Sequence, residues 1–146
     1  MHSPRSAPSW QAVAAAALLA FAGGAGAQAL SSADVGEMRR VIDAQLEAFA
    51  RDDEPRAFSY ASPGIRERFG TAATFAAMVR EQYAVVYRPA SRRFLRPVVE
   101  DGTVIFPVQL SGADGRVWVA LYVMQREAGE WKVAGCQLVP GAGAAT

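Results

Sequence analysis

Apolar residues in the first half of the chain recur at the three- and four-residue intervals of an α-helix. Ser31 is a suitable N-cap for the first such run, which predicts a helix from about residue 32 to residue 50. A short helix is predicted after Asp53, a further turn of helix after Ser62-Pro63, and a third helix from Thr71 to the stop at Arg88-Pro89. The apolar face of the first helix consists of Val35, Met38, Ile42, Leu46 and Phe49.

After Pro89 the apolar residues alternate with a period of two, which is typical of β-strands. Turn signals at Asp101-Gly102, Asp114-Gly115 and Ala128-Gly129 divide this half into four strands. The strands are expected at about 92–100, 103–110, 116–126 and 131–139. Helices followed by strands joined through short turns predict an α+β domain, with three helices packed on a four-stranded antiparallel meander.

The turn at Asp114-Gly115 predicts which strand residues share a face. A two-residue loop would pair Leu110 with Val119 and Val108 with Leu121, and directly opposite residues lie on the same face. The predicted core face is therefore Leu95, Val99, Val104, Phe106, Val108, Leu110, Val117, Val119, Leu121 and Val123. Ala128-Gly129 is a poorer two-residue turn, so Trp131 and Cys136 are not assigned to either face.

The opposite sheet face is also apolar in this register. It carries Phe94, Val98, Ile105, Trp118, Tyr122 and Met124, together with Ala120, and it is diluted by the polar residues Arg96, Gln109 and Thr103. A sheet face in contact with water normally carries polar residues, so we expect the first six of these residues to form a homodimer interface.

The first 27 residues have the pattern of a secretory signal. An apolar stretch at 12–22 precedes Ala25-Gly26-Ala27, which provides the small residues of a cleavage site. The stretch is too short to span a bilayer. We expect cleavage after Ala27, an exported product that is soluble in the periplasm or secreted, a single domain at 28–139 and a loose tail at 140–146. The alternatives are an uncleaved anchor and an Ala/Gly tail on a cytosolic protein.

Composition excludes several classes of chemistry. The formal net charge is +1, which provides no electrostatic footprint for nucleic acid. The only histidine, His2, lies in the predicted signal, so the mature domain has no His-based acid–base catalysis and no His-ligated metal. We expect neither a metal site nor a cofactor, and we interpret the single cysteine, Cys136, as a buried structural residue.

A local basic run consists of Arg88, Arg92, Arg93 and Arg96. It could bind an anionic ligand or phosphate. The interpretation favoured by the near-zero net charge is a solvated strand edge, on which the charges prevent aggregation.

Several segments resemble a family of small exported bacterial proteins described only as a domain of unknown function. They include Gln45–Phe49, Ala57–Pro63, Tyr87-Arg88-Pro89 and Trp131–Cys136. The order of helices and strands is similar to the nuclear transport factor 2-like cone, in which a curved sheet wraps a long helix. The resemblance implies this fold and export, and it implies no activity.

Relatives of the cone fold place Asp and Tyr side chains in a pocket, for which the candidates here are Asp43, Tyr60, Tyr83 and Tyr87. If the cone is hollow, we expect an apolar pocket lined by Tyr60, Phe75, Met78, Tyr83 and Tyr87. We therefore predict a non-catalytic module that binds a small hydrophobic ligand or a protein partner. The alternatives are a His-free isomerase- or hydrolase-like enzyme that uses Asp and Tyr, and a purely structural dimer, which a solidly packed cone would favour.

Overall fold

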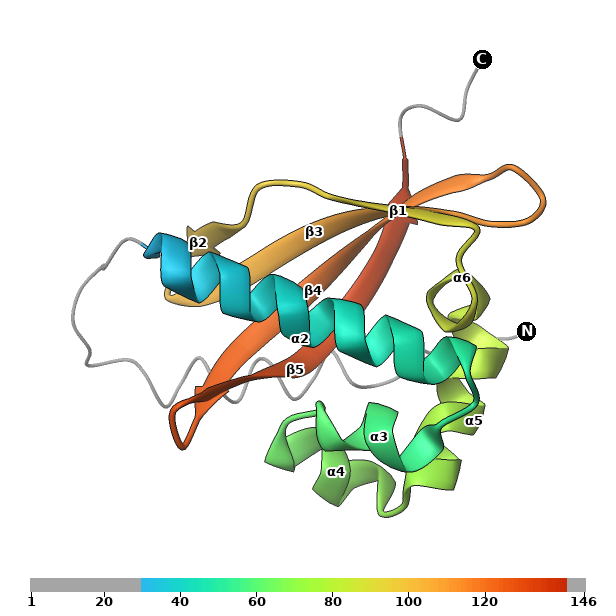
Figure 1. The fold of residues 1–146 in the computed structure, drawn as a ribbon, viewed down its shortest axis with the longest axis horizontal. Coiled ribbons are helices and arrows are strands. Elements are labelled where there is room, and N and C mark those ends of the chain that lie inside the picture. Colours follow the sequence, from blue (N-terminus) through green and yellow to red (C-terminus); the bar gives the residue numbers. More distant parts are fainter. Residues whose placement is uncertain (1–29, 142–146) are drawn as a thin grey trace, which may run out of the picture.

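The computed structural model describes residues 30–141, and within them five helices precede five strands (Figure 1). The helices are α2 (Ser32–Ala50), α3 (Glu54–Ser59), α4 (Pro63–Phe69), α5 (Ala72–Gln82) and α6 (Ala84–Tyr87). The strands are β1 (Ser91–Phe94), β2 (Val98–Glu100), β3 (Thr103–Ser111), β4 (Val117–Glu127) and β5 (Glu130–Pro140). This arrangement confirms the α+β class. The predicted signal and residues 142–146 of the predicted tail lie outside the described residues.

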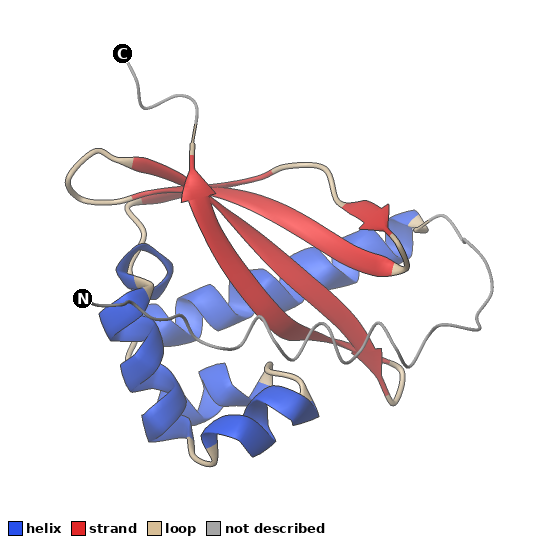
Figure 2. Ribbon diagram, turned by 180° about the vertical axis from the view of Figure 1, so that it is seen from behind, coloured by secondary structure: helices blue, strands red, loops and turns tan. Residues whose placement is uncertain are grey.

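The long helix α2 is built as its sequence predicts. The Ser31 side chain accepts a hydrogen bond from the backbone N–H of Asp34 at 3.0 Å, and the Asp34 side chain completes a capping box. Four of the five predicted apolar positions, Met38, Ile42, Leu46 and Phe49, are buried. The helix lies across one face of the sheet, and the view from behind shows no described helix over the opposite face (Figure 2).

The predicted third helix is broken in the structure. Tyr83 has an extended φ of −133° and separates α5 from α6. The β-branched pair Val85-Val86 follows the break, and such residues have a reduced helix propensity. Tyr83, Val86 and Tyr87 are all buried, so the change of direction brings both tyrosines into the core.

The predicted strand at 92–100 is two strands, which corrects the strand count from four to five. β1 and β2 both pair with β3, in a sheet whose main order is β1-β3-β4-β5. The ladder stops after Phe94 because Leu95 lies opposite Pro107, which has no N–H to donate, and because Pro97 follows two residues later. No helix among the described residues is long and apolar enough to cross a membrane.

The predicted register of β4 is wrong by one residue. Leu110 pairs with Trp118, Val108 with Ala120 and Phe106 with Tyr122, which leaves residues 112–116 in the loop instead of Asp114-Gly115 alone. The backbone N–H of Gly112 bonds to the carbonyl of Arg116 at 2.9 Å and closes this longer loop. A one-residue shift moves every side chain of a strand to the other face.

The six residues of the predicted dimer interface therefore do not share one face of the sheet. Tyr122 and Met124 are buried beneath the helices, and Phe94 packs edge-on against Phe106 with 5.6 Å between ring centroids. Trp118 lies opposite Leu110, on the core side, and is half-buried. Of the six predicted residues, only Val98 and Ile105 lie on the outer face. The outer face nevertheless has an apolar centre, and its half-buried apolar residues include Ile105, Pro107, Val119, Leu121 and Val123.

A bulge places Trp131 and Cys136 on the same face. Ala128 and Gly129 form a two-residue turn with φ values of +50° and +83°. Cys136 pairs with Tyr122. The next core-facing residue of β4 is Met124, and it pairs with Val133 because the register shifts by one residue between Val123 and Met124. Cys136 is fully buried, and this burial raises the pKa of its thiol, which confirms it as a core residue.

Candidate functional site

Two residues of the predicted apolar pocket, Phe75 and Tyr87, belong to a dense aromatic cluster. Phe75 is fully buried, and its ring centroid is 5.8 Å from that of Phe49 and 5.6 Å from those of Phe58 and Phe69. The Phe49 ring in turn lies 5.3 Å from the ring of Tyr87. These rings join α2 to the shorter helices and form part of the hydrophobic core.

The other members of that predicted set are placed at different depths. Tyr83 and Tyr87 are 6% and 3% exposed, whereas Met78 and Tyr60 are half-buried. A ligand-binding role for the set stays a prediction. Aromatic packing accounts for the burial of Phe75.

An Asp–Tyr pair does form, but between Tyr87 and a residue other than the predicted Asp43. The Tyr87 hydroxyl donates to Asp52 Oδ1 at 2.7 Å and accepts from Arg80 at 3.1 Å. Arg88 donates to the second oxygen of Asp52 at 2.8 Å. Asp52 follows α2 with a left-handed φ of +58°, so these bonds connect the end of α2 to α5 and α6.

The ionisation of this pair favours a structural role. The hydrogen bonds from Tyr87 and Arg88 lower the pKa of Asp52 below its ordinary 3.8. Burial and the bond to Asp52 raise the pKa of Tyr87 above its ordinary value. A general acid or base works best when its pKa lies near the working pH. Both pKa values move away from neutrality, so the pair is better suited to holding helices together than to transferring protons.

Replacing Asp52 with asparagine is expected to lower the free energy of unfolding at neutral pH. Because the folded state lowers the Asp52 pKa, the carboxylate stabilises the fold above pH 3.8, and this stabilisation is lost as the pH falls through the lower folded pKa. Asparagine tolerates the left-handed conformation, so the backbone is kept, while the change removes the charge and one of the two oxygens that accept from Tyr87 and Arg88.

Urea unfolding at neutral pH and at a pH well below 3.8, beneath the lowered pKa of the folded state, measures this difference. The matched control is Asp101→Asn, since Asp101 is exposed and has a φ of +52° but forms no ion pair within the described residues. An Asp52→Asn effect of the same size at both pH values would contradict a role for the charge.

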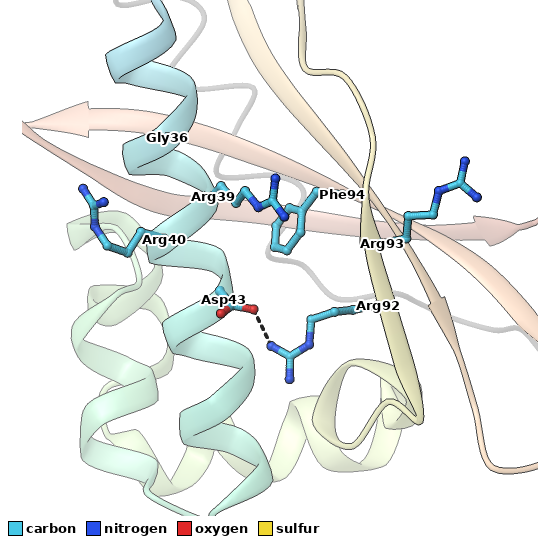
Figure 3. Close-up of a pocket in the computed structure, with 7 residues that line it drawn as sticks. All are labelled: Gly36, Arg39, Arg40, Asp43, Arg92, Arg93 and Phe94. Carbon is cyan, nitrogen blue, oxygen red and sulfur yellow. Dashed lines mark hydrogen bonds and ion pairs between the residues drawn. The ribbon is translucent and has the colours of Figure 1, made fainter.

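A cleft of about 530 Å³ lies between α2 and β1 (Figure 3). Its lining is dominated by charged side chains. The lining residues are Gly36, Arg39, Arg40, Asp43, Arg92, Arg93 and Phe94.

Arg92 is held at the inner side of this cleft by two acids of α2. Its guanidinium donates to Asp43 Oδ1 at 2.6 Å and to Glu47 Oε2 at 3.1 Å, and its side chain is only 26% exposed. Asp43, a candidate pocket acid of the alternative enzyme hypothesis, thus forms an ion pair with Arg92.

The remaining three arginines of the cleft are exposed. The guanidinium of Arg39 lies 4.8 Å above the centroid of the Phe94 ring, while Arg40 and Arg93 extend outward on either side (Figure 3). None of the three lies within 4.0 Å of a carboxylate oxygen of the described residues. The cleft therefore contains unbalanced positive charge.

The basic run of the sequence contributes only in part to this cleft. Arg92 and Arg93 line it, whereas Arg88 bonds to Asp52 and is not among the lining residues. Arg39 and Arg40 on α2 were not among the residues predicted from the sequence. Their signal was two adjacent arginines outside the apolar stripe of an amphipathic helix, which is also typical of an ordinary solvated face.

Two further features of the described residues concern metal ligands and a buried hydroxyl. No group of three or more His, Cys, Asp or Glu side chains is arranged to hold a metal ion between residues 30 and 141. The buried hydroxyl of Tyr122 has no hydrogen-bond partner there, and its burial raises its pKa well above the ordinary value.

A comparison with curated proteins found no match. A family model matches residues 31–146, which include every described helix and strand. The chain therefore belongs to the family described as Domain of unknown function (DUF4864).

Proposed function

We propose that this protein is a non-catalytic binding module, and that the cleft between α2 and β1 receives an anionic group of its ligand. The observation that carries the proposal is the group of three exposed arginines, Arg39, Arg40 and Arg93, which have no acidic partner among the described residues. Four arginines and one aspartate line the cleft.

Arginine is suited to this role because its planar guanidinium forms paired hydrogen bonds to carboxylate and phosphate groups. Arg39 is already positioned by its contact with the Phe94 ring. Phe94 in turn is supported from the core by Phe106. A supported side chain loses less conformational entropy when it binds a ligand.

The lining favours an anionic ligand over the small hydrophobic ligand expected from the sequence. Among the described residues, Phe94 is the only large apolar one that lines this cleft, and one side of its ring already contacts Arg39. The alternative of a His-free enzyme finds less support here, because Asp43 is paired with Arg92.

The test uses citrate and inorganic phosphate as probes, with binding measured by calorimetry at low ionic strength. We expect the double variant Arg39→Gln/Arg93→Gln to bind citrate at least about tenfold more weakly, because one hydrogen bond to a charged group is worth about 1.5–3 kcal/mol. Added salt should weaken binding to the unmodified protein.

The control is Arg56→Gln/Arg68→Gln, which removes the same charge from exposed positions on α3 and α4. If both double variants lose citrate affinity equally, binding reflects net charge alone and the proposed site is wrong. If neither probe binds the unmodified protein, anion binding in this cleft is contradicted.

We also propose that the domain has the nuclear transport factor 2-like cone architecture and that it is exported. The long helix α2 across one face of an antiparallel sheet supports the first (Figure 2). The apolar stretch before Ala25-Gly26-Ala27 supports the second. The mass of the mature protein tests cleavage after Ala27, and a full-length product as the main species would contradict it.

A homodimer through the outer sheet face remains a proposal, now with different residues. Its support is the apolar set Ile105, Pro107, Val119, Leu121 and Val123, with the exposed Val98 beside them. An apolar sheet face of this kind is stabilised when a second surface covers it.

A further inference from the structure

We infer that the ligand of the cleft is an acidic, extended polypeptide segment that adds as a strand to the free edge of β1. The inference rests on the proposed function and specifies the occupant of the same site. Three observations carry it: the pairing pattern of β1, the distribution of arginines around its edge, and the open form of the cleft.

The pairing pattern leaves backbone groups of β1 unpaired. β1 lies at the end of the strand order and pairs only with β3 within the described sheet. The N–H of Leu95 bonds to the carbonyl of Pro107 at 3.0 Å, and Arg93 lies opposite Gln109 in the same register. Because bonded positions alternate along an antiparallel pair, Arg92 and Phe94 direct their N–H and C=O groups away from β3. These groups form the free edge.

Positive side chains lie on both sides of that edge. Arg39 reaches the edge from α2, on the core-facing side, while Arg93 extends from the opposite side of β1 (Figure 3). Successive side chains of an added strand would point alternately toward α2 and away from it. Acidic residues on either face of such a strand would therefore meet an arginine.

The cleft suits an extended chain better than a compact ion. Because Arg39 and Arg93 lie on opposite sides of β1, an extended chain along the edge can reach both of them (Figure 3). The exposed main-chain groups of Arg92 and Phe94 are matched by another main chain, as in peptide recognition by strand addition. Charged side chains on an edge strand normally prevent indiscriminate pairing. The arginines of β1 prevent pairing with a second copy of β1, because like charges would face each other. The same arginines attract an acidic segment.

The experiment measures binding of fluorescently labelled eight-residue peptides to the purified protein by anisotropy. The first peptide alternates Glu with Thr, the second replaces each Glu with Gln, and the third keeps Glu but has N-methyl groups on four consecutive central amides. N-methylation removes backbone donors and blocks strand pairing in either register while it retains the charge. We expect the second and third peptides to bind at least tenfold more weakly than the first.

Protein variants and amide exchange locate the binding. Arg39→Gln/Arg93→Gln should lower the affinity for the first peptide at least tenfold, and Arg56→Gln/Arg68→Gln should leave this affinity unchanged. The amide hydrogens of Arg92 and Phe94 should exchange more slowly when the first peptide is bound.

The outcomes separate this inference from the proposed function. Equal binding of the methylated and unmethylated Glu peptides would overturn strand addition and leave anion binding intact. Citrate binding that depends on Arg39 and Arg93, with no binding of any peptide, would likewise overturn strand addition and leave anion binding intact. Failure of both citrate and the peptides would overturn both.

Discussion

Replacing Tyr122 with arginine is expected to unfold the domain, whereas replacing the adjacent Leu121 with arginine is expected to leave it folded. Tyr122 has no exposed surface, and it pairs with Phe106 and Cys136 on the core side of the sheet. Leu121 lies on the opposite, outer face and is half-buried. An unpaired charge in the core costs about 3–5 kcal/mol or more, against a total stability of about 5–15 kcal/mol for a domain.

Circular dichroism and urea unfolding of the two variants measure this difference. Because the register predicted from the sequence places Leu121 in the core and Tyr122 outside, it requires the reverse outcome.

Sedimentation of Leu121→Arg also tests the proposed dimer. The proposal requires a dimeric wild type and a folded, monomeric variant. A monomeric wild type at tens of micromolar would contradict the dimer.

Replacing Phe75 with alanine is expected to lower the free energy of unfolding by about 3–5 kcal/mol. Phe75 is fully buried and lies within 5.8 Å of three other aromatic rings, measured between centroids. Its removal leaves a cavity that the three neighbouring rings, from α2, α3 and α4, cannot easily fill. The midpoint of urea unfolding should fall while the slope stays the same.

The control for this variant is Met78→Ala, on the same helix. Met78 is half-buried at the margin of the core, so its loss should cost distinctly less. A small effect of Phe75→Ala would contradict a packing role. It would support the earlier expectation that Phe75 lines an apolar ligand pocket.

Local sequence signals were sufficient to place the starts of α2, α4 and α5, although they did not predict the break at Tyr83 between α5 and α6. The side chains of Ser31, Ser62 and Thr71 each accept a backbone hydrogen bond at the start of α2, α4 and α5, as capping residues do. These interactions span three residues, so a short window of sequence contains both partners. The change of period at Pro89 likewise separated the helices from the strands correctly.

The cleft could not be derived in this way. Asp43 and Arg92, which form its ion pair, are 49 residues apart, and each belongs to an element that is predictable on its own. Their proximity depends on how α2 crosses the sheet, which neither segment specifies. Arg39 and Arg93 lie at the same cleft only because α2 crosses the sheet beside β1 (Figure 3).

By itself, the sequence determined the α+β class, the limits of α2 and the apolar character of both faces of β4, because these depend on the order and spacing of neighbouring residues. The tertiary structure alone decided which face of β4 is buried. Val119, Leu121 and Val123 are as apolar as Ala120, Tyr122 and Met124, so hydrophobicity could not distinguish the two registers. The longer loop at 112–116 shifted the pairing by one residue, and the helices then packed against the face that carries Tyr122.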